Sequence, residues 1–215
     1  MSTIVIIDYG MGNLHSIAKA LEHVAGKERV IVTGDQEKIL AADRVVLPGV
    51  GAIRDCMAEL GRSGLDTVVK QVAAEKPLLG VCLGMQALLD HSEENQGTDC
   101  LGLIPGNVRH FPDSASGNSA GERLKIPHMG WNQVQQQRGQ AMWTDIPNDS
   151  RFYFVHSYYV ETSRAEDVAA TTRYGIEFAS VLVHENIFAV QFHPEKSQHA
   201  GLQLLSNFVH WNGDS

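Results

Sequence analysis

A cysteine flanked by glycines is the best-placed nucleophile in this chain. Cys82 lies in the segment Gly80-Val81-Cys82-Leu83-Gly84, directly after an apolar run and directly before a helical pattern. Glycines two positions before and two after it allow the sharp strand-to-helix turn that exposes a nucleophile. The positive end of the following helix favours a thiolate there. The pattern predicts that Cys82 is catalytic, whereas Cys56 and Cys100 lack this context and are expected to be small buried side chains.

A cysteine nucleophile needs a general base, and the base needs a group that orients it. His193, Pro194 and Glu195 follow the apolar run 187–192. Pro194 disfavours helical geometry at His193, and in an extended chain the first and third side chains share a face. We therefore expect Glu195 to hold one tautomer of His193 and to stabilise its imidazolium form. Taken alone, the motif is equally typical of a solvated His and Glu at a strand end.

A second turn rich in glycine follows another expected strand. Pro48-Gly49-Val50-Gly51 comes directly after the apolar run 45–47. Its backbone N–H groups, together with that of Leu83, are expected to form an oxyanion hole. Standing alone, this segment would be interpreted as a plain turn.

The elements that must hold these groups alternate along the first half of the chain. Short apolar runs of the buried-strand type alternate with helical patterns, which predicts an α/β fold with an open, mostly parallel sheet flanked by helices. The expected strands are 4–7, 30–32, 45–47 and 78–81, and the expected helices are 14–24 and 53–74, the latter interrupted at Gly61 to Gly64.

The second half of the chain has a different sequence pattern. Alternating, aromatic-rich runs from about Asn107 predict mostly antiparallel or mixed strands at 123–126, 151–160, 168–172, 179–183 and 187–192. The polar segment Asp113 to Glu122 reads as a surface loop, and a closing helix is expected after Ser197. No linker divides the chain, so we predict one domain over residues 1–215.

The composition restricts the function. With 43% hydrophobic residues the chain can bury a sizeable core, and a formal net charge of −8 disfavours binding to nucleic acid or to anionic membranes. The first residues lack positive charge and the longest uncharged stretch, Pro77 to Leu89, is too short to span a bilayer, so we expect a cytoplasmic protein. Three cysteines without a CxxC pair argue against a zinc site, and no metal or other cofactor is expected.

These motifs carry a family resemblance. VCLGMQ around Cys82, the PGVG segment and the HPE segment together resemble the class I (triad) glutamine amidotransferases over nearly the whole chain. The resemblance implies that Cys82, His193 and Glu195 form the triad. The cysteine would attack the side-chain amide of glutamine, giving ammonia and a glutamyl thioester that water converts to glutamate.

The same resemblance implies a substrate pocket. Gly51 and Leu83 would bind the oxyanion. Further pocket residues would be Gln86, the backbone of Ser157 and Tyr158, and Glu94 as partner of the substrate ammonium. Gln86 on an exposed helix face and Glu94 as a solvated loop carboxylate are the alternatives.

Three other segments resemble one branch of the family. DYGMGNLHS, KIPHMGWN and FYFVHSYY, at 8–16, 125–132 and 152–159, are similar to the glutaminase subunits of imidazole glycerol phosphate synthases. The resemblance implies a heterodimer with a (β/α)₈ barrel cyclase that consumes the ammonia in histidine biosynthesis. Asn13, Trp131 and Lys196 are expected on the partner face, with a core position for Trp131 and a surface-lysine role for Lys196 as alternatives.

Two other functions remain open. One is a triad glutaminase that serves another synthase, such as anthranilate or pyridoxal phosphate synthase, and DYGMGNLHS with HMGWN argues against it. The other is a catalytically silent scaffold subunit of the same fold, against which the complete set of Cys82, His193 and Glu195 argues.

Overall fold

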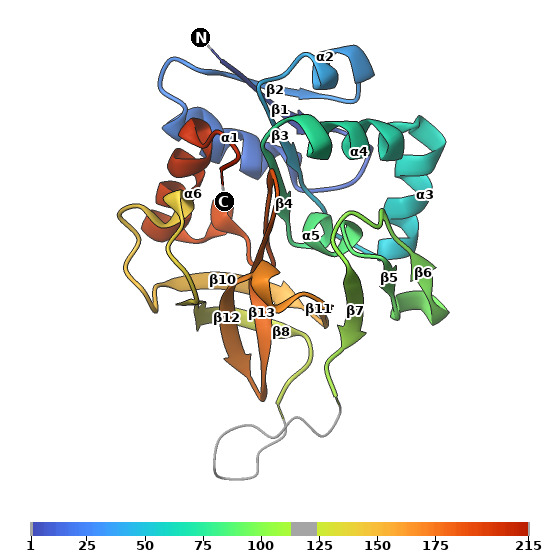
Figure 1. Ribbon diagram of the computed structural model, residues 1–215, viewed down its shortest axis with the longest axis vertical. Coiled ribbons are helices and arrows are strands. Elements are labelled where there is room, and N and C mark those ends of the chain that lie inside the picture. The colour runs from blue at the N-terminus through green and yellow to red at the C-terminus, as the bar shows by residue number, and fades with distance from the viewer. Residues whose placement is uncertain (1, 113–123, 215) are drawn as a thin grey trace.

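Five parallel strands form the part of the sheet that carries the cysteine turn (Figure 1). The computed structural model describes residues 2–112 and 124–214. In spatial order these strands are β2 (Arg29–Thr33), β1 (Thr3–Ile7), β3 (Arg44–Leu47), β4 (Leu78–Val81) and β14 (Ile187–Val190). All residues of β4 and β14 are buried. Because both faces of these strands are buried, their sequences are continuous apolar runs.

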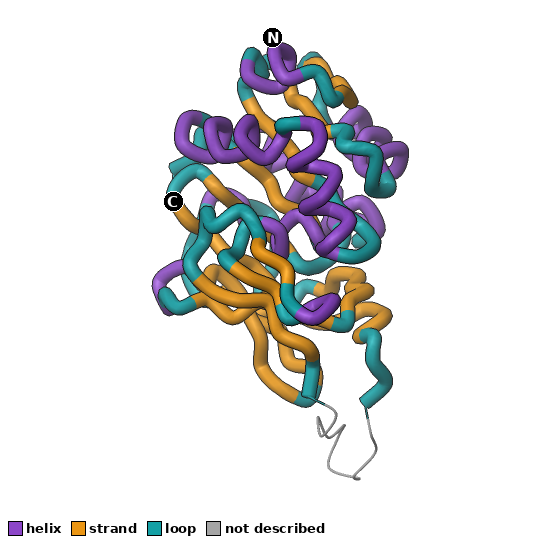
Figure 2. Tube along the Cα trace, turned by 90° about the vertical axis from the view of Figure 1, so that its right-hand side faces the viewer, coloured by secondary structure: helices purple, strands orange, loops and turns teal. Residues whose placement is uncertain are grey.

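Helices cover both faces of this parallel region. Alternate residues of β1 supply the two cores, because successive side chains of a strand point to opposite faces. Ile4 and Ile6 belong to the core under α1 (Leu14–Val24) and α6 (Gln198–His210), whereas Val5 and Ile7 face the other core. That second core is covered by α2 (Gln36–Leu40), α3 (Ile53–Ser63) and α4 (Leu65–Glu75). Figure 2 shows these helices around the upper part of the molecule and the remaining strands below them.

The rest of the sheet is mostly antiparallel. Beyond β14 come β13 (Ile176–His184), β11 (Tyr158–Thr162), β7 (Gly106–His110), β5 (His91–Ser92) and β6 (Thr98–Asp99), while β12 (Val168–Tyr174) pairs with β13 and with β9 (Gln135–Gln136). A separate two-stranded ribbon consists of β8 (His128–Gln133) and β10 (Arg151–His156). The short α5 (Leu83–Ala87) follows β4. Single 3₁₀ turns lie at Glu94–Gln96, Ala141–Trp143, Ala165–Asp167 and Pro194–Lys196.

The structure confirms the predicted α/β class and corrects three of the predicted elements. The run 151–160 is not one strand, because it leaves the ribbon at Ser157 and enters the main sheet as β11. Residues 124–126 are not a strand, since Pro127 lacks the N–H that a ladder needs and β8 begins after it. The interruption of 53–74 is confined to Gly64, whose φ is +69°. The surface loop expected at Asp113 to Glu122 lies outside the described residues.

Helix α2 was not predicted from the sequence. Its first turn is stabilised by Asp35, whose side chain accepts hydrogen bonds from the N–H groups of Glu37 and Lys38. With five residues, this helix is too short to show a clear periodic pattern. None of the helices in the described ranges is long and apolar enough to cross a membrane.

The close approach of α5 to β3 requires glycine at position 84. A Cβ atom there would lie 2.0 Å from the carbonyl oxygen of Leu47, and backbone of a central strand cannot move aside. At Gly80 a Cβ would lie 2.8 Å from Leu88 Cδ1 and 3.3 Å from Ala189 Cβ. The two glycines around Cys82 therefore do more than permit a turn, because they let a helix begin in contact with the sheet.

We expect Gly84→Ala to lower the free energy of unfolding by about 3 kcal/mol, as overpacking against fixed backbone does. Gly61→Ala is the matched control, since Gly61 lies inside α3 with nothing within 4 Å of an added Cβ. That control should gain about 0.5–1 kcal/mol from helix propensity. Urea unfolding of both variants measures the difference, and equal stabilities would contradict the steric explanation.

Candidate active site

Cys82 sits on the turn between β4 and α5 with a strained backbone. Its φ of +53° and ψ of −110° are rarely adopted by a residue with a side chain. Its N–H donates to the Val190 carbonyl at 2.8 Å, and its own carbonyl accepts from Met85 and Gln86 at 3.0 and 3.2 Å. Strand β14 on one side and helix α5 on the other thus hold the turn. The Leu83 N–H begins α5, so it has no partner within the helix.

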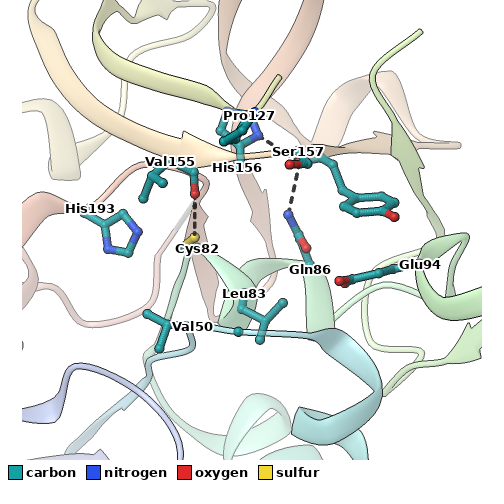
Figure 3. Close-up of a pocket in the computed structure, with 12 residues that line it drawn as sticks. Val50, Cys82, Leu83, Gln86, Glu94, Pro127, Val155, His156, Ser157 and His193 are labelled. Carbon is teal, nitrogen blue, oxygen red and sulfur yellow. Dashed lines mark hydrogen bonds between the residues drawn. The ribbon is translucent and has the colours of Figure 1, made fainter. Parts of the chain in front are cut away.

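A cavity of about 330 Å³ opens above this turn (Figure 3). We call it the active-site cavity. Most of the site residues expected from the sequence line it, namely Gly51, Cys82, Leu83, Gln86, Glu94, Ser157, Tyr158 and His193. Val50, from the turn expected to form the oxyanion hole, lines it as well. Pro127, Val155 and His156 also line it and were not predicted as site residues. Segments from both halves of the chain therefore meet at one site.

His193 and Glu195 form a buried pair beside the cysteine. Nδ1 of His193 lies 2.8 Å from Oε1 of Glu195, and each side chain is only 3% exposed. His193 is extended, as Pro194 predicts, and its N–H donates to the Tyr153 carbonyl at 2.9 Å. With Nδ1 engaged by the carboxylate, Nε2 is the ring nitrogen available to the thiol (Figure 3).

The charges around His193 favour its protonated form. Burial alone would lower its pKa, but the adjacent Cys82 sulfur and the Glu195 carboxylate, which is hydrogen-bonded to Nδ1, raise the pKa of His193 to about 10. An imidazolium beside a thiolate is the arrangement that activates a cysteine nucleophile. The carboxylate of Glu195 therefore acts on the sulfur through the ring.

The other two cysteines lie in different surroundings. Cys56 is buried as expected, whereas Cys100 is only partly buried, which corrects its expected buried position. Burial raises the pKa of Cys56 to about 11 and that of Cys100 to about 12. Cys56 contacts the hydroxyl of Tyr9 at 3.5 Å, and Cys100 contacts the Thr98 carbonyl at 3.6 Å. Both remain thiols at neutral pH.

Glu94 and Gln86 are fixed by backbone groups. Oε2 of Glu94 accepts from the N–H of Ile53 at 3.1 Å, at the N-terminus of α3, and its carboxylate faces the cavity (Figure 3). Gln86 is 4% exposed, and its Nε2 donates to the Tyr158 carbonyl at 3.1 Å and to Oε1 of Gln191 at 3.0 Å. Glu94 is thus not a fully solvated loop carboxylate, and Gln86 does not lie on an exposed helix face.

Several residues that hold the cavity lining in place were not predicted from the sequence. The Tyr9 hydroxyl donates to the Pro48 carbonyl at 2.8 Å and so anchors the Pro48–Gly51 turn. His128 and His156 form a buried pair with 2.9 Å between Nδ1 and Nε2. No local spacing could have indicated these contacts, because each joins segments more than 25 residues apart.

The residues expected on a partner face are exposed around the site. Asn13 caps α1 and is exposed, as is Lys196 directly after Glu195. Trp131 is 43% exposed, which excludes a core position, and its ring packs on Tyr153 at 6.1 Å between centroids. Met129, two residues earlier on the same strand, is 62% exposed and was not predicted. Within residues 2–112 and 124–214, no group of three or more His, Cys, Asp or Glu side chains could hold a metal ion.

A thiol, an imidazole and a carboxylate in this order, on a strand-to-helix turn of an α/β sheet, define the class of cysteine-dependent hydrolases and acyl transferases. Comparison with known families is more specific. The chain belongs to the glutamine amidotransferase class-I family, whose sequence model matches residues 5–211.

Individual relatives match over the full length. The protein named imidazole glycerol phosphate synthase subunit HisH 1 of Pseudomonas aeruginosa is 58% identical over 213 residues, covering 99% of each chain. The protein of Nitrosococcus oceani named imidazole glycerol phosphate synthase subunit HisH is 59% identical over 215 residues, covering all of both chains.

Solved structures share the fold. PurLQS from Thermotoga maritima has a TM-score of 0.71 at 16% identity, covering 98% of each chain. A second structure, described as a glutamine amidotransferase, has a TM-score of 0.67 at 17% identity, covering 96% of this chain and 99% of the other.

Replacing Glu195 by Gln removes the charge that supports the imidazolium, so the pKa of His193 should fall from about 10. A raised pKa means that the imidazolium persists below about pH 10 and is lost above it. The alkaline limb of glutamine hydrolysis should therefore move to lower pH in Glu195→Gln. Measuring kcat/KM against pH for both proteins tests this, and an unmoved limb would contradict the role given to the carboxylate.

Proposed function

We propose that this chain is the glutaminase subunit of an imidazole glycerol phosphate synthase, acting in the cytoplasm as a single domain. The observation that carries the proposal is the full-length identity of 58–59% with relatives of that name, combined with the complete set of Cys82, His193 and Glu195 at one cavity. The reaction would release ammonia for a cyclase partner in histidine biosynthesis.

In this proposal Cys82 is the nucleophile. The proton of Cys82 has passed to Nε2 of His193, and the thiolate Sγ attacks the carboxamide carbon of glutamine. The imidazolium then gives that proton to the departing ammonia, which leaves a glutamyl thioester on Cys82. Water, activated by neutral His193, attacks the thioester and releases glutamate.

The oxyanion of each tetrahedral intermediate needs N–H donors. We assign the Leu83 N–H, free at the start of α5, and the Gly51 N–H to this role. Gly51 lines the cavity with a φ of +97°, which few residues other than glycine adopt. Tyr9 holds the other end of the same turn at Pro48.

The remaining cavity residues fit a free amino acid. The Glu94 carboxylate, held by Ile53, is assigned to the substrate ammonium, and Gln86 and Ser157 to the polar groups beside it. The carbonyl of Tyr158 already accepts hydrogen bonds from Gln86 and His156. We therefore assign the Tyr158 carbonyl to the positioning of Gln86, and the remaining backbone groups of Ser157 and Tyr158 to contact with the substrate.

The partner would dock on the face that bears the cavity mouth. Trp131 packs on Tyr153, whose carbonyl binds the His193 N–H, and Lys196 follows three residues later. Exposed apolar side chains next to the site, such as Met129 and Trp131, suit the surface of a (β/α)₈ barrel cyclase that closes over the ammonia. Asn13, beside His193 and Glu195 at a small cavity, lies on the same side.

Cys82→Ala should lower glutamate release by about 10⁴-fold or more, because loss of the nucleophile removes the thioester route. His193→Ala should cost more than Glu195→Ala, since positioned proton transfer contributes about 10²–10⁴ in rate. A glutamine-like electrophile should label Cys82, and should spare Cys56 and Cys100. Glutamate assay and mass spectrometry check these outcomes. Normal hydrolysis by Cys82→Ala, or equal labelling of all three thiols, would refute the assignment.

Hydrolysis by the isolated chain should be slow, with full activity only when the barrel subunit carries its ribonucleotide. The reason is that the Pro48–Gly51 turn contains two glycines and can turn its N–H groups away, and loss of one oxyanion donor costs about 10²–10³ in kcat. Glutamate production by the chain, the complex and the liganded complex measures the coupling.

Trp131→Ala should weaken that activation. Val32→Ala, at an equally exposed valine on β2, is the control. Equal rates for the isolated chain and the liganded complex would identify a stand-alone glutaminase instead.

A further inference from the structure

We propose that Gln191 is a further catalytic residue, whose side-chain amide donates to Sγ of Cys82 and stabilises the thiolate. The proposal also holds that the carbonyl of Tyr158, acting through Gln86, fixes the orientation of this amide. It rests on the proposed function only in taking Cys82 as the nucleophile.

The sheet places Gln191 beside the nucleophile. The parallel pair of β4 and β14 sets Val81 beside Val190, so Cys82 and Gln191 leave the sheet side by side. Gln191 is fully buried, and its Nε2 lies 3.8 Å from Sγ. On another side, Sγ lies 4.0 Å from the Val155 carbonyl. The protonated thiol can donate to that carbonyl, whereas the thiolate needs a donor, and Gln191 supplies one.

A carbonyl that can only accept decides which way the amides point. The group of Gln86 that faces the Tyr158 oxygen at 3.1 Å must be its NH₂. The second hydrogen of that NH₂ points to Gln191 at 3.0 Å, so the facing atom of Gln191 must be Oε1. The NH₂ of Gln191 is then left to face Sγ. If the Gln191 amide were turned over, its NH₂ would face the NH₂ of Gln86, and its Oε1 would face the thiolate of Cys82.

The Tyr158 carbonyl is itself fixed by a second chain of donors. Nδ1 of His156 lies 2.8 Å from it and must carry the hydrogen, so Nε2 of His156 accepts from Nδ1 of His128 at 2.9 Å. Nε2 of His128 accepts in turn from the Asn132 amide at 3.2 Å. Burial lowers the pKa of His128 to about 4 and that of His156 to about 3, which keeps both rings neutral. The donor and acceptor in each of these hydrogen bonds are thus fixed by the Tyr158 carbonyl oxygen, which can only accept.

The experiment measures the reactivity of the Cys82 sulfur rather than the turnover of glutamine. The rate of alkylation of Cys82 by iodoacetamide is followed against pH by mass spectrometry in the full chain. Gln191→Met keeps the length of the side chain and removes the donor. The pH of half-maximal alkylation should rise by roughly one to two units, the size expected for one hydrogen bond to a charged group. Gln203→Met, at a half-buried amide bonded to Asn207 on α6, should leave the profile unchanged.

Two further variants keep the proposal falsifiable if Gln191→Met fails to fold. Gln191→Glu retains an acceptor for Gln86 and sets an oxygen towards Sγ, so its shift should be at least as large. Gln86→Met leaves Gln191 in place but frees its amide to rotate, and should shift the profile in the same direction.

An unchanged alkylation profile in a folded Gln191 variant would overturn the role of Gln191. An unchanged profile in Gln86→Met would overturn the control of orientation by Tyr158. Since alkylation needs no glutamine, a shifted profile in a protein that hydrolyses no glutamine even with the liganded barrel subunit would support Gln191 and refute only the proposed function.

Discussion

The contact on which the site depends is the approach of the α5 backbone to the end of β3. Gly84 lies so close to the Leu47 carbonyl that no side chain fits between them. This contact starts the helix against the sheet, and the chain must therefore turn at Cys82 with the positive φ observed there. The position of the nucleophile, the free N–H of Leu83 and the place of Gln86 one turn later all follow from it.

Strand pairing in the sheet brings the catalytic residues together. Parallel pairing of β4 and β14 aligns residues more than 100 positions apart, so the end of one strand supplies the thiol and the end of the other supplies the amide, imidazole and carboxylate. The break at Ser157 adds the third component, because there the chain passes from the β8–β10 ribbon into the main sheet across the mouth of the cavity. A single continuous strand over 151–160 would not expose the backbone of this segment.

The parts of this arrangement that were predictable from the sequence are those with a local signature. Buried strands, the glycine-bracketed cysteine and the HPE segment each carry their meaning within a few residues, and β4 has the bounds that its apolar run indicated. The parallel edge that gathers them follows from the alternation of strands and helices. The family resemblance supplied Glu94 and Ser157, whose own sequence context is unremarkable.

The contacts that no local pattern encodes were not predictable. Tyr9 meets Pro48, His128 meets His156, and Gln191 meets both Gln86 and Cys82 only after folding. A buried glutamine at a strand end looks in the sequence like an ordinary polar residue. Its role depends on which hydrogen-bond donors and acceptors surround it, and only the folded structure brings these groups together.

The different surroundings of the three cysteines also bear on oxidation. Cys56 and Cys100 are held as protonated thiols by burial, and thiols react with peroxide far more slowly than thiolates do. Cys82 lines the cavity beside an imidazolium, so of the three cysteines it is the one most open to oxidation. A sulfenic acid at this position would silence the site while leaving the two cores intact. Inactivation by oxidants is thus separated from unfolding, and a reductant that reaches the cavity can restore the enzyme.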